Sequence, residues 1–173
     1  MYPTSGPEHE YIGYNVVGGT TDALGSTSFK QFLKRVTIEK SGAGCLLVSI
    51  DMYVKGNASG VQVLYPVVCD DNAGAPGKMI GGFGAETQAG AIVLSASLSA
   101  TARWISLPMS MWLTPASYWL MVLGGGSSGF TAHYDSGGSD YTSTGAATWY
   151  NNDGGAATNS SRNYSIRGSV VYL

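Results

Sequence analysis

The chain has 173 residues, and only 12% of them are charged, with 9 Lys and Arg against 11 Asp and Glu. This length fits one domain with a sizeable core. Residues 104–161 contain no Lys or Arg, so a basic surface with the several phosphate contacts that a nucleic acid needs is excluded. The 25 Gly and 11 Tyr favour many short strands joined by turns.

The N-terminal stretch predicts a loose arm. Residues 1–10 are mostly polar and contain Pro3 and Pro7, with Met1 and Tyr2 as their only large apolar side chains. Such a segment has little to bury, so we expect it to order on neighbouring subunits and not to support folding. The stretch also lacks the cationic start and apolar core of a secretory signal. A single domain is expected over residues 11–173.

Alternation of apolar and polar residues begins at residues 32–40 and is clearest at residues 45–56. The pattern places five side chains on one face of a strand: Leu46, Val48, Ile50, Met52 and Val54. It places three on the opposite face: Ser49, Asp51 and Lys55. A turn at residues 57–60 and a second strand at residues 61–69 then predict a β-hairpin.

Further apolar runs along the chain predict more short strands. They lie at residues 78–83, 90–98, 102–107, 110–113, 117–123, 129–134, 146–150 and 163–172. Roughly ten short strands with frequent turn signals predict an all-β fold, an antiparallel β-sandwich with a jelly-roll-like arrangement.

Residues 104–123 form an uncharged stretch long enough to be tested as a membrane helix. Pro108 and Pro115 interrupt it, no cationic cluster flanks it, and the letters TPAS indicate a turn. Two buried strands explain the stretch better, and we expect no membrane insertion.

The two cysteines follow from the predicted hairpin. Cys45 and Cys69 would fall almost opposite each other, where a disulfide is conceivable, although a shift of one residue in register would separate them. Without a secretory signal, two reduced and half-buried thiols are the favoured interpretation.

Residues 70–81, DDNAGAPGKMIG, follow the second strand of that hairpin. The spaced acids and closing Glu of an EF-hand are missing, and so is the Walker spacing of a phosphate loop. A turn fits, because Gly74 and Gly77 accept positive φ and Pro76 fixes its own φ. A surface calcium held by Asp70, Asp71 and Asn72 is the alternative.

The same turn begins a longer pattern that resembles a known family. The turn residues are followed by WISL and then LTPASYWLMV, which is similar to β-sandwich domains of bacteriophage tail and virion proteins and of bacterial surface proteins. The matching residues are Asp71, Asn72, Gly74, Pro76, Gly77, Trp104, Leu107, Leu113, Tyr118, Trp119 and Leu120. The flanking strands also match the family pattern, so the resemblance covers residues 11–172. Pro66 and Ala116 depart from the family pattern, and Pro66 hints at an edge or bulged strand.

Catalytic and metal-binding patterns are not found in the sequence. His9 and His133 have no companion at ligand spacing, and no GxSxG nucleophile motif occurs. A glycosidase pair would have to come from Glu86, Asp135, Asp140 or Asp153, and nothing singles out two of them. We therefore expect a protein that is not an enzyme and that holds no cofactor and no metal.

Residues 124–164 combine small polar residues with scattered aromatic side chains. This composition is typical of binding surfaces, where rigid rings supply contact area. The candidate contact residues are Tyr134, Tyr141, Trp149 and Tyr150, among which Tyr141 and Tyr150 are favoured, because Trp149 also suits the core.

The resemblance implies a structural component of a bacteriophage virion, a minor tail or tail-tip protein in preference to a capsid decoration protein. Its partners would be other virion proteins, with several copies or a homo-oligomer per particle, and its location the virion, assembled in the host cytoplasm. A carbohydrate-binding module for host-surface glycan is the first alternative. An adhesion domain of a bacterial cell-surface protein is the second.

Overall fold

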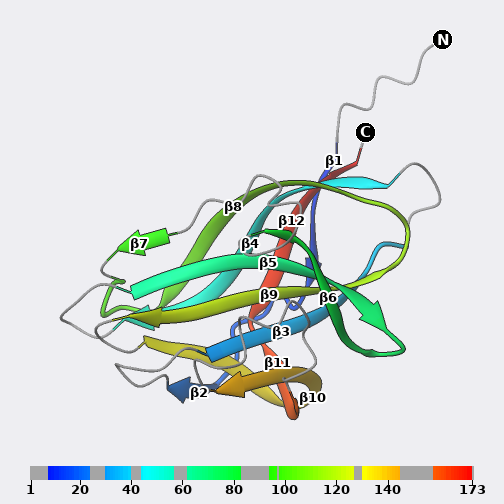
Figure 1. Cartoon of the computed structure of the whole chain (residues 1–173). Coiled ribbons are helices and arrows are strands. Elements are labelled where there is room, and N and C mark those ends of the chain that lie inside the picture. The colour runs from blue at the N-terminus through cyan, green and yellow to red at the C-terminus, as the bar shows by residue number, and fades with distance from the viewer. Residues whose placement is uncertain are drawn as a thin grey trace.

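The computed structural model describes residues 8–23, 30–39, 44–56, 62–82, 94–96, 98–126, 130–144 and 158–172. Its regular elements are twelve strands, all paired antiparallel (Figure 1). They are β1 (Glu8–Gly13), β2 (Thr20–Ala23), β3 (Lys30–Thr37), β4 (Cys45–Gly56), β5 (Gln62–Asn72), β6 (Ala75–Gly82), β7 (Leu94–Ala96), β8 (Arg103–Leu113), β9 (Ser117–Gly126), β10 (Phe130–Thr144), β11 (Thr158–Tyr164) and β12 (Ile166–Tyr172). The predicted all-β antiparallel fold is confirmed, with twelve strands in place of about ten.

The strands form two layers that one long strand joins. One layer has the order β1, β12, β4, β8, and the other has β3, β9, β5, with β6 and β7 at its edge. Strand β10 pairs with β4 near its start and with β3 near its end, and along its length it also pairs with β2 and β11. The hydrogen-bonded network is therefore continuous, and it folds over into a sandwich-like arrangement (Figure 1).

The main core lies between the two layers and draws apolar side chains from both. Fully buried examples are Phe32, Leu47, Ile50, Met52, Leu64, Leu107, Leu120, Val122 and Ile166. A second buried cluster contains Leu33, Val67, Cys69, Met79, Trp119 and Met121, with Tyr141 packed against it. In β9 the buried run is continuous from Tyr118 to Gly124, because alternate side chains enter the two clusters on opposite faces of the strand.

Strand β4 changes phase part-way along its length, which corrects the predicted face. The register with β12 shifts by one residue between Leu47 and Ser49. Ile50, Met52 and Val54 are buried as expected, but before the shift the fully buried side chains are Cys45 and Leu47, while Leu46 and Val48 are half-buried. A bulge of one residue exchanges the two faces, because side chains alternate with a period of two.

The predicted hairpin of residues 45–56 and 61–69 is wrong. Strand β4 pairs with β12, β8 and β10, whereas β5 pairs with β9, β6 and β7. The chain thus crosses from one layer to the other between these strands. Cys45 and Cys69 are both buried and form no disulfide, and they lie one in each apolar cluster. The favoured pair of reduced thiols is present, but it is buried and not half-buried.

Other strand boundaries also differ from expectation. Residues 104–123 form nearly all of β8 and most of β9, with the break at residues 114–116. Pro108 stays inside β8, where its side chain is exposed. Pro66 stays inside β5, between the part that pairs with β7 and the part that pairs with β6. In both places the missing N–H is tolerated because a strand edge is open.

The first described residues of the chain belong to the sheet. Strand β1 begins at Glu8 and pairs with β12 along its whole length, so the last three residues of the expected arm belong to the sheet. Residues 1–7 and the expected strand at residues 146–150 lie outside the described residues. Within the described part, no helix is long and apolar enough to cross a membrane.

Candidate binding face

The layer β1–β12–β4–β8 turns one face to the core and the other outward. Cross-strand pairing brings residues of all four strands into rows on the outer face. One row runs Gly13, Arg167, Asp51, Ser106, and another runs His9, Val171, Leu46, Trp112. Tyr53 and Trp104 are paired at one end of this face. We call this surface the aromatic face and define it by Tyr11, Leu46, Tyr53, Trp104, Trp112, Arg167 and Val171.

Arg167 lies at the centre of the aromatic face between two rings. Its guanidinium carbon is 3.8 Å from the ring centroid of Tyr11 and 4.1 Å from that of Trp104. Its Nε donates to the Asp51 carboxylate at 3.1 Å, and its Nη1 donates to Asn15. Stacked and paired in this way, the arginine holds both rings in place, and its charge is balanced by Asp51.

The aromatic contacts continue across β4. Tyr53 meets Trp104 edge to face at 5.6 Å and His133 at 5.0 Å between ring centroids. The Tyr53 hydroxyl donates to the backbone oxygen of Ala102 at 3.2 Å. His133 Nδ1 lies 3.1 Å from the backbone oxygen of Gly18. These side chains form a continuous aromatic wall from β8 to β10.

Exposure distinguishes the aromatic face from the core. Tyr11 is 52% exposed and Trp112 is 41% exposed. The other large apolar side chains exposed among the described residues are Val16 and Val17, in the segment that follows β1. Exposed apolar side chains on the same face of a sheet, with a paired arginine between them, are typical of a binding surface.

The two predicted contact residues that the structure describes, Tyr134 and Tyr141, lie outside the aromatic face. Tyr134 is half-buried, with the Arg162 guanidinium 4.5 Å from its ring centroid and the ring of Tyr164 at 5.8 Å. Tyr141 packs edge to face on buried Trp119 at 5.0 Å. The two tyrosines thus support two different apolar clusters and form no common platform. Trp149 and Tyr150 lie outside the described residues.

The residues that do form a platform carried a signal in the sequence. In β8 the letters W, S, P, S, W at positions 104, 106, 108, 110 and 112 alternate with I, L, M, M, L. The second set points inward and the first set outward. Two tryptophans in phase with Ser and Pro therefore mark an outward aromatic surface, which a search for aromatic-rich composition does not detect.

The predicted turn at residues 70–77 is present as a two-residue hairpin between β5 and β6. Asn72 pairs with Ala75, and Ala73 and Gly74 have φ of 52° and 89°, as a type I′ turn requires. Gly77, by contrast, is not among the residues with positive φ. A Cβ at Gly77 would come within 2.0 Å of the Asp70 carboxylate, so its small size is required for steric reasons.

Asp71 connects this turn to the second apolar cluster. Its carboxylate accepts from Arg35 Nε at 2.8 Å, from the Gly74 N–H at 3.0 Å and from Trp119 Nε1 at 2.8 Å. The Arg35 guanidinium is the main reason that the pKa of Asp71 lies below its usual value. Asp71 and Trp119, matching residues from the two halves of the family-like pattern, thus meet in one structural unit.

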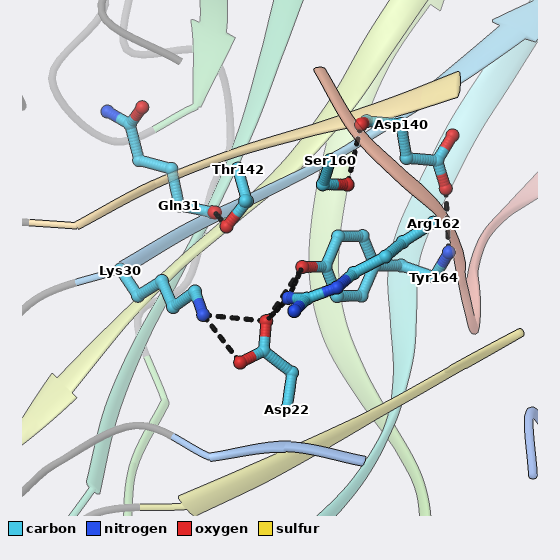
Figure 2. A network of polar contacts seen from close by, with 8 residues as sticks. All are labelled: Asp22, Lys30, Gln31, Asp140, Thr142, Ser160, Arg162 and Tyr164. Carbon is cyan, nitrogen blue, oxygen red and sulfur yellow. Dashed lines mark hydrogen bonds and ion pairs between the residues drawn. The ribbon is translucent and has the colours of Figure 1, made fainter. Parts of the chain in front are cut away.

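A polar network ties β10 and β11 to β2 and β3 (Figure 2). Lys30 Nζ donates to both carboxylate oxygens of Asp22 at 2.6 Å, and the Tyr164 hydroxyl donates to Asp22 at 2.8 Å. Arg162 contacts the same carboxylate. Burial raises the pKa of Tyr164 to about 12, so its hydroxyl stays protonated and remains a donor.

The remaining candidate acids and histidines form no catalytic constellation in the described residues. His9 is exposed on β1. Asp135 accepts from the Tyr14 hydroxyl at 2.6 Å, which is the main reason that its pKa is lowered. No group of three His, Cys, Asp or Glu side chains gathers as a metal site in the described part. Glu86 and Asp153 lie outside it.

Comparison with known proteins adds no relative. No family model, no curated protein and no solved structure matches this chain.

Proposed function

We propose that this chain is a structural component of a bacteriophage virion, a tail or tail-tip protein, and that it acts by binding through its aromatic face. The observation that carries the binding role is the exposure of Tyr11 and Trp112 on one flat sheet face, around the stacked Arg167. The sequence resemblance supports the placement in a virion. Multiple copies or a homo-oligomer, in contact with other virion proteins, fit a flat and partly apolar surface.

The distribution of charge supports binding over catalysis. Among the described residues, ion pairs hold Lys30, Lys34, Arg35, Arg162 and Arg167. Their partner carboxylates are engaged in the same contacts. Charges used in this way stabilise the fold and do not present a cluster of reactive groups to a substrate.

The experiment is a search for the protein in purified particles. Virions are isolated by density gradient from the lysate of the source phage, and the chain is quantified by mass spectrometry. We expect a fixed number of copies per particle that survives a high-salt wash. The absence of the chain from intact, infective particles would contradict the proposal.

Recognition of host-surface glycan is the second candidate. The feature that favours it is the combination of Tyr11 and Trp104 with polar Asn15 and Asp51 beside Arg167. Aromatic rings suit the apolar faces of sugars, and the polar groups suit their hydroxyls. Binding to isolated host envelopes is measured for the parent chain and for Trp104→Ala.

The matched control for that measurement is Lys78→Ala, which removes an exposed side chain from β6 in the other layer. Glycan recognition predicts lost binding for Trp104→Ala alone. Equal binding by the parent chain, Trp104→Ala and Lys78→Ala would place recognition elsewhere and leave the aromatic face as a surface for protein assembly.

A further inference from the structure

One lysine lies inside the sandwich at the meeting point of three strands. Lys34 is on the core-facing side of β3, between buried Phe32 and Val36, and its side chain is 16% exposed. Its Nζ donates to the side-chain oxygen of Asn163 on β11 and lies 3.1 Å from the Asp140 carboxylate on β10. An amine, a carboxamide and a carboxyl group are thus in direct contact where water is largely excluded.

The carboxyl group of this trio is held in one orientation. The Asp140 side chain is 1% exposed, and its second oxygen accepts from the Tyr164 N–H at 2.7 Å. Burial raises the pKa of Asp140 to about 6, although Lys34 opposes the shift. The proton of the Lys34 ammonium therefore has a fixed acceptor within reach, and transfer leaves a neutral amine beside a carboxylic acid.

The ring of Tyr14 closes the other side of the site, with its centroid 5.5 Å from Lys34 Nζ. Burial of this kind favours the protonated, neutral form of the Asp140 carboxyl group. A neutral lysine amine is a nucleophile, and Lys34 Nζ already contacts the side-chain oxygen of Asn163, whose Cγ is an electrophilic carbon.

We propose that Lys34 and Asn163 form an intramolecular isopeptide bond, with Asp140 as the proton carrier. Lys34 Nζ attacks Cγ of Asn163, and a new N–C bond forms while Asp140 donates a proton to the amide oxygen. The tetrahedral intermediate then collapses: the Cγ–Nδ2 bond breaks, the proton released from Nζ passes through Asp140 to the leaving nitrogen, and the proton on the oxygen returns to Asp140 as the carbonyl re-forms. One ammonia is released, no oxidant or reductant is required, and Asp140 is regenerated.

A second buried lysine shows what the trio adds. Lys30 Nζ donates to the carboxylate of Asp22, and that carboxylate also meets Arg162 and the Tyr164 hydroxyl. A carboxylate paired with two cations is a poor electrophile. The group that Lys30 contacts is such a carboxylate, whereas Lys34 contacts a carboxamide. The chemistry therefore selects Lys34, and Lys30 serves as the internal control.

The proposed bond would join β3 to β11 across 129 residues of sequence. A covalent link that closes so long a loop restricts the unfolded chain and stabilises the folded one. It would also keep the two strands together under mechanical load, which suits a component of a particle that meets a cell surface.

The test combines intact mass with peptide mapping, on the full chain under denaturing conditions. We expect the parent chain to be lighter than its sequence by one ammonia, and protease digestion to yield one branched peptide that contains both Lys34 and Asn163. Lys34→Arg should have its full mass, whereas Lys30→Arg should keep the loss. Asn163→Asp should lose one water in place of ammonia, and Asp140→Asn should react far more slowly.

Two results would overturn the proposal. One is a parent chain of full mass after prolonged incubation of the folded protein. The other is an ammonia loss that maps within a single linear peptide, as an asparagine succinimide would. Both results concern the parent chain, so they decide the question even where a variant fails to fold.

Discussion

The outer faces of the two layers use the same three residue types in opposite ways. On the β3–β9–β5 layer, Trp119, Arg35 and Asp71 meet, and Trp119 is fully buried with its Nε1 bonded to Asp71. On the β1–β12–β4–β8 layer, Trp104, Arg167 and Asp51 meet. There the tryptophan is half-buried and stacks on the guanidinium, beside exposed Tyr11.

The difference shows that residue type alone does not separate a core residue from a contact residue. A tryptophan that is buried on both sides contributes apolar burial, and its N–H must find a partner. A tryptophan on an open face keeps contact area available for a partner molecule. The following substitutions test whether the first face serves stability and the second serves binding.

Trp119→Ala should have the largest effect on stability. It removes a fully buried ring that packs with Tyr141 and leaves a cavity, at a cost of about 3–5 kcal/mol in the free energy of unfolding. The matched variant Trp104→Ala should cost only about 1 kcal/mol, as is usual for partly exposed positions. Urea unfolding followed by fluorescence measures both. Similar losses for the two variants would remove the distinction between the faces.

Asp71→Ala should be the next most destabilising change. The variant leaves the Arg35 guanidinium, the Gly74 N–H and the Trp119 Nε1 without their acceptor, which should cost about 2–3 kcal/mol. Asp51→Ala should cost less, because the partners of Asp51 are Arg167 and Ser49 alone. The measurement is again urea unfolding, and an Asp51→Ala variant less stable than Asp71→Ala would reverse the ranking.

The pH dependence of stability should show two slopes of opposite sign. The pKa of Asp140 is raised from 3.8 to about 6, so the folded chain binds this proton more tightly than the unfolded chain. Its contribution is complete below pH 4 and is lost as the pH rises through about 6, and the loss is about 3 kcal/mol. An isopeptide bond would remove the Lys34 charge, which lowers the pKa of Asp140. The pKa of Asp140 would therefore stay raised, and the slope of stability against pH would keep its sign.

Asp71 should act in the opposite direction. Its pKa is lowered, so its stabilising contribution is present above pH 4 and is lost as the pH falls below that value. Unfolding free energies measured from pH 3 to 7 for Asp140→Asn and Asp71→Asn separate the two slopes. Asp140→Asn should flatten the curve between pH 4 and 6, and an unchanged curve there would contradict the burial of an ionisable Asp140.

Gly77→Val tests the turn that anchors the covered face, with an expected loss of about 1–2 kcal/mol from steric conflict. The conflict is with the Asp70 carboxylate, so adding Asp70→Ala should recover part of the loss. Gly74→Ala is the control, because Gly74 has positive φ and open space around it. The stability lost in Gly74→Ala should be the same with and without the Asp70→Ala replacement. Thermal unfolding of the single and double variants measures the coupling.

Trp112→Ala should have the smallest effect on stability and a clear effect on binding. Its side chain is 41% exposed at the outer edge of the aromatic face, so we expect a loss below about 1 kcal/mol. Incorporation into particles, in competition with the parent chain, should fall. Undiminished incorporation, with Lys78→Ala as reference, would exclude Trp112 from the contact surface.

Several features could be predicted because they depend on residues close in sequence. Alternation over β8 and β12 and the continuous apolar run of β9 indicate strands, and together they specify an all-β class. The Asn72–Ala75 turn was recognisable because Gly74 supplies positive φ within four residues. The outward phase of Trp104 and Trp112 was also visible in the alternation of β8.

What the sequence by itself determined is therefore most of the longer strands, the turn between β5 and β6, and most of the inward faces, whereas β1, β2 and β11 were not predicted. Only the tertiary structure decided which strands pair, since the same alternation suits β4 beside β5 and β4 beside β12. It also decided which outer face is covered, and it brought Lys34, Asp140 and Asn163 together. Local patterns depend on residues that are neighbours in the chain. The contacts of Lys34 with Asp140 and Asn163 instead arise from packing between segments more than one hundred residues apart.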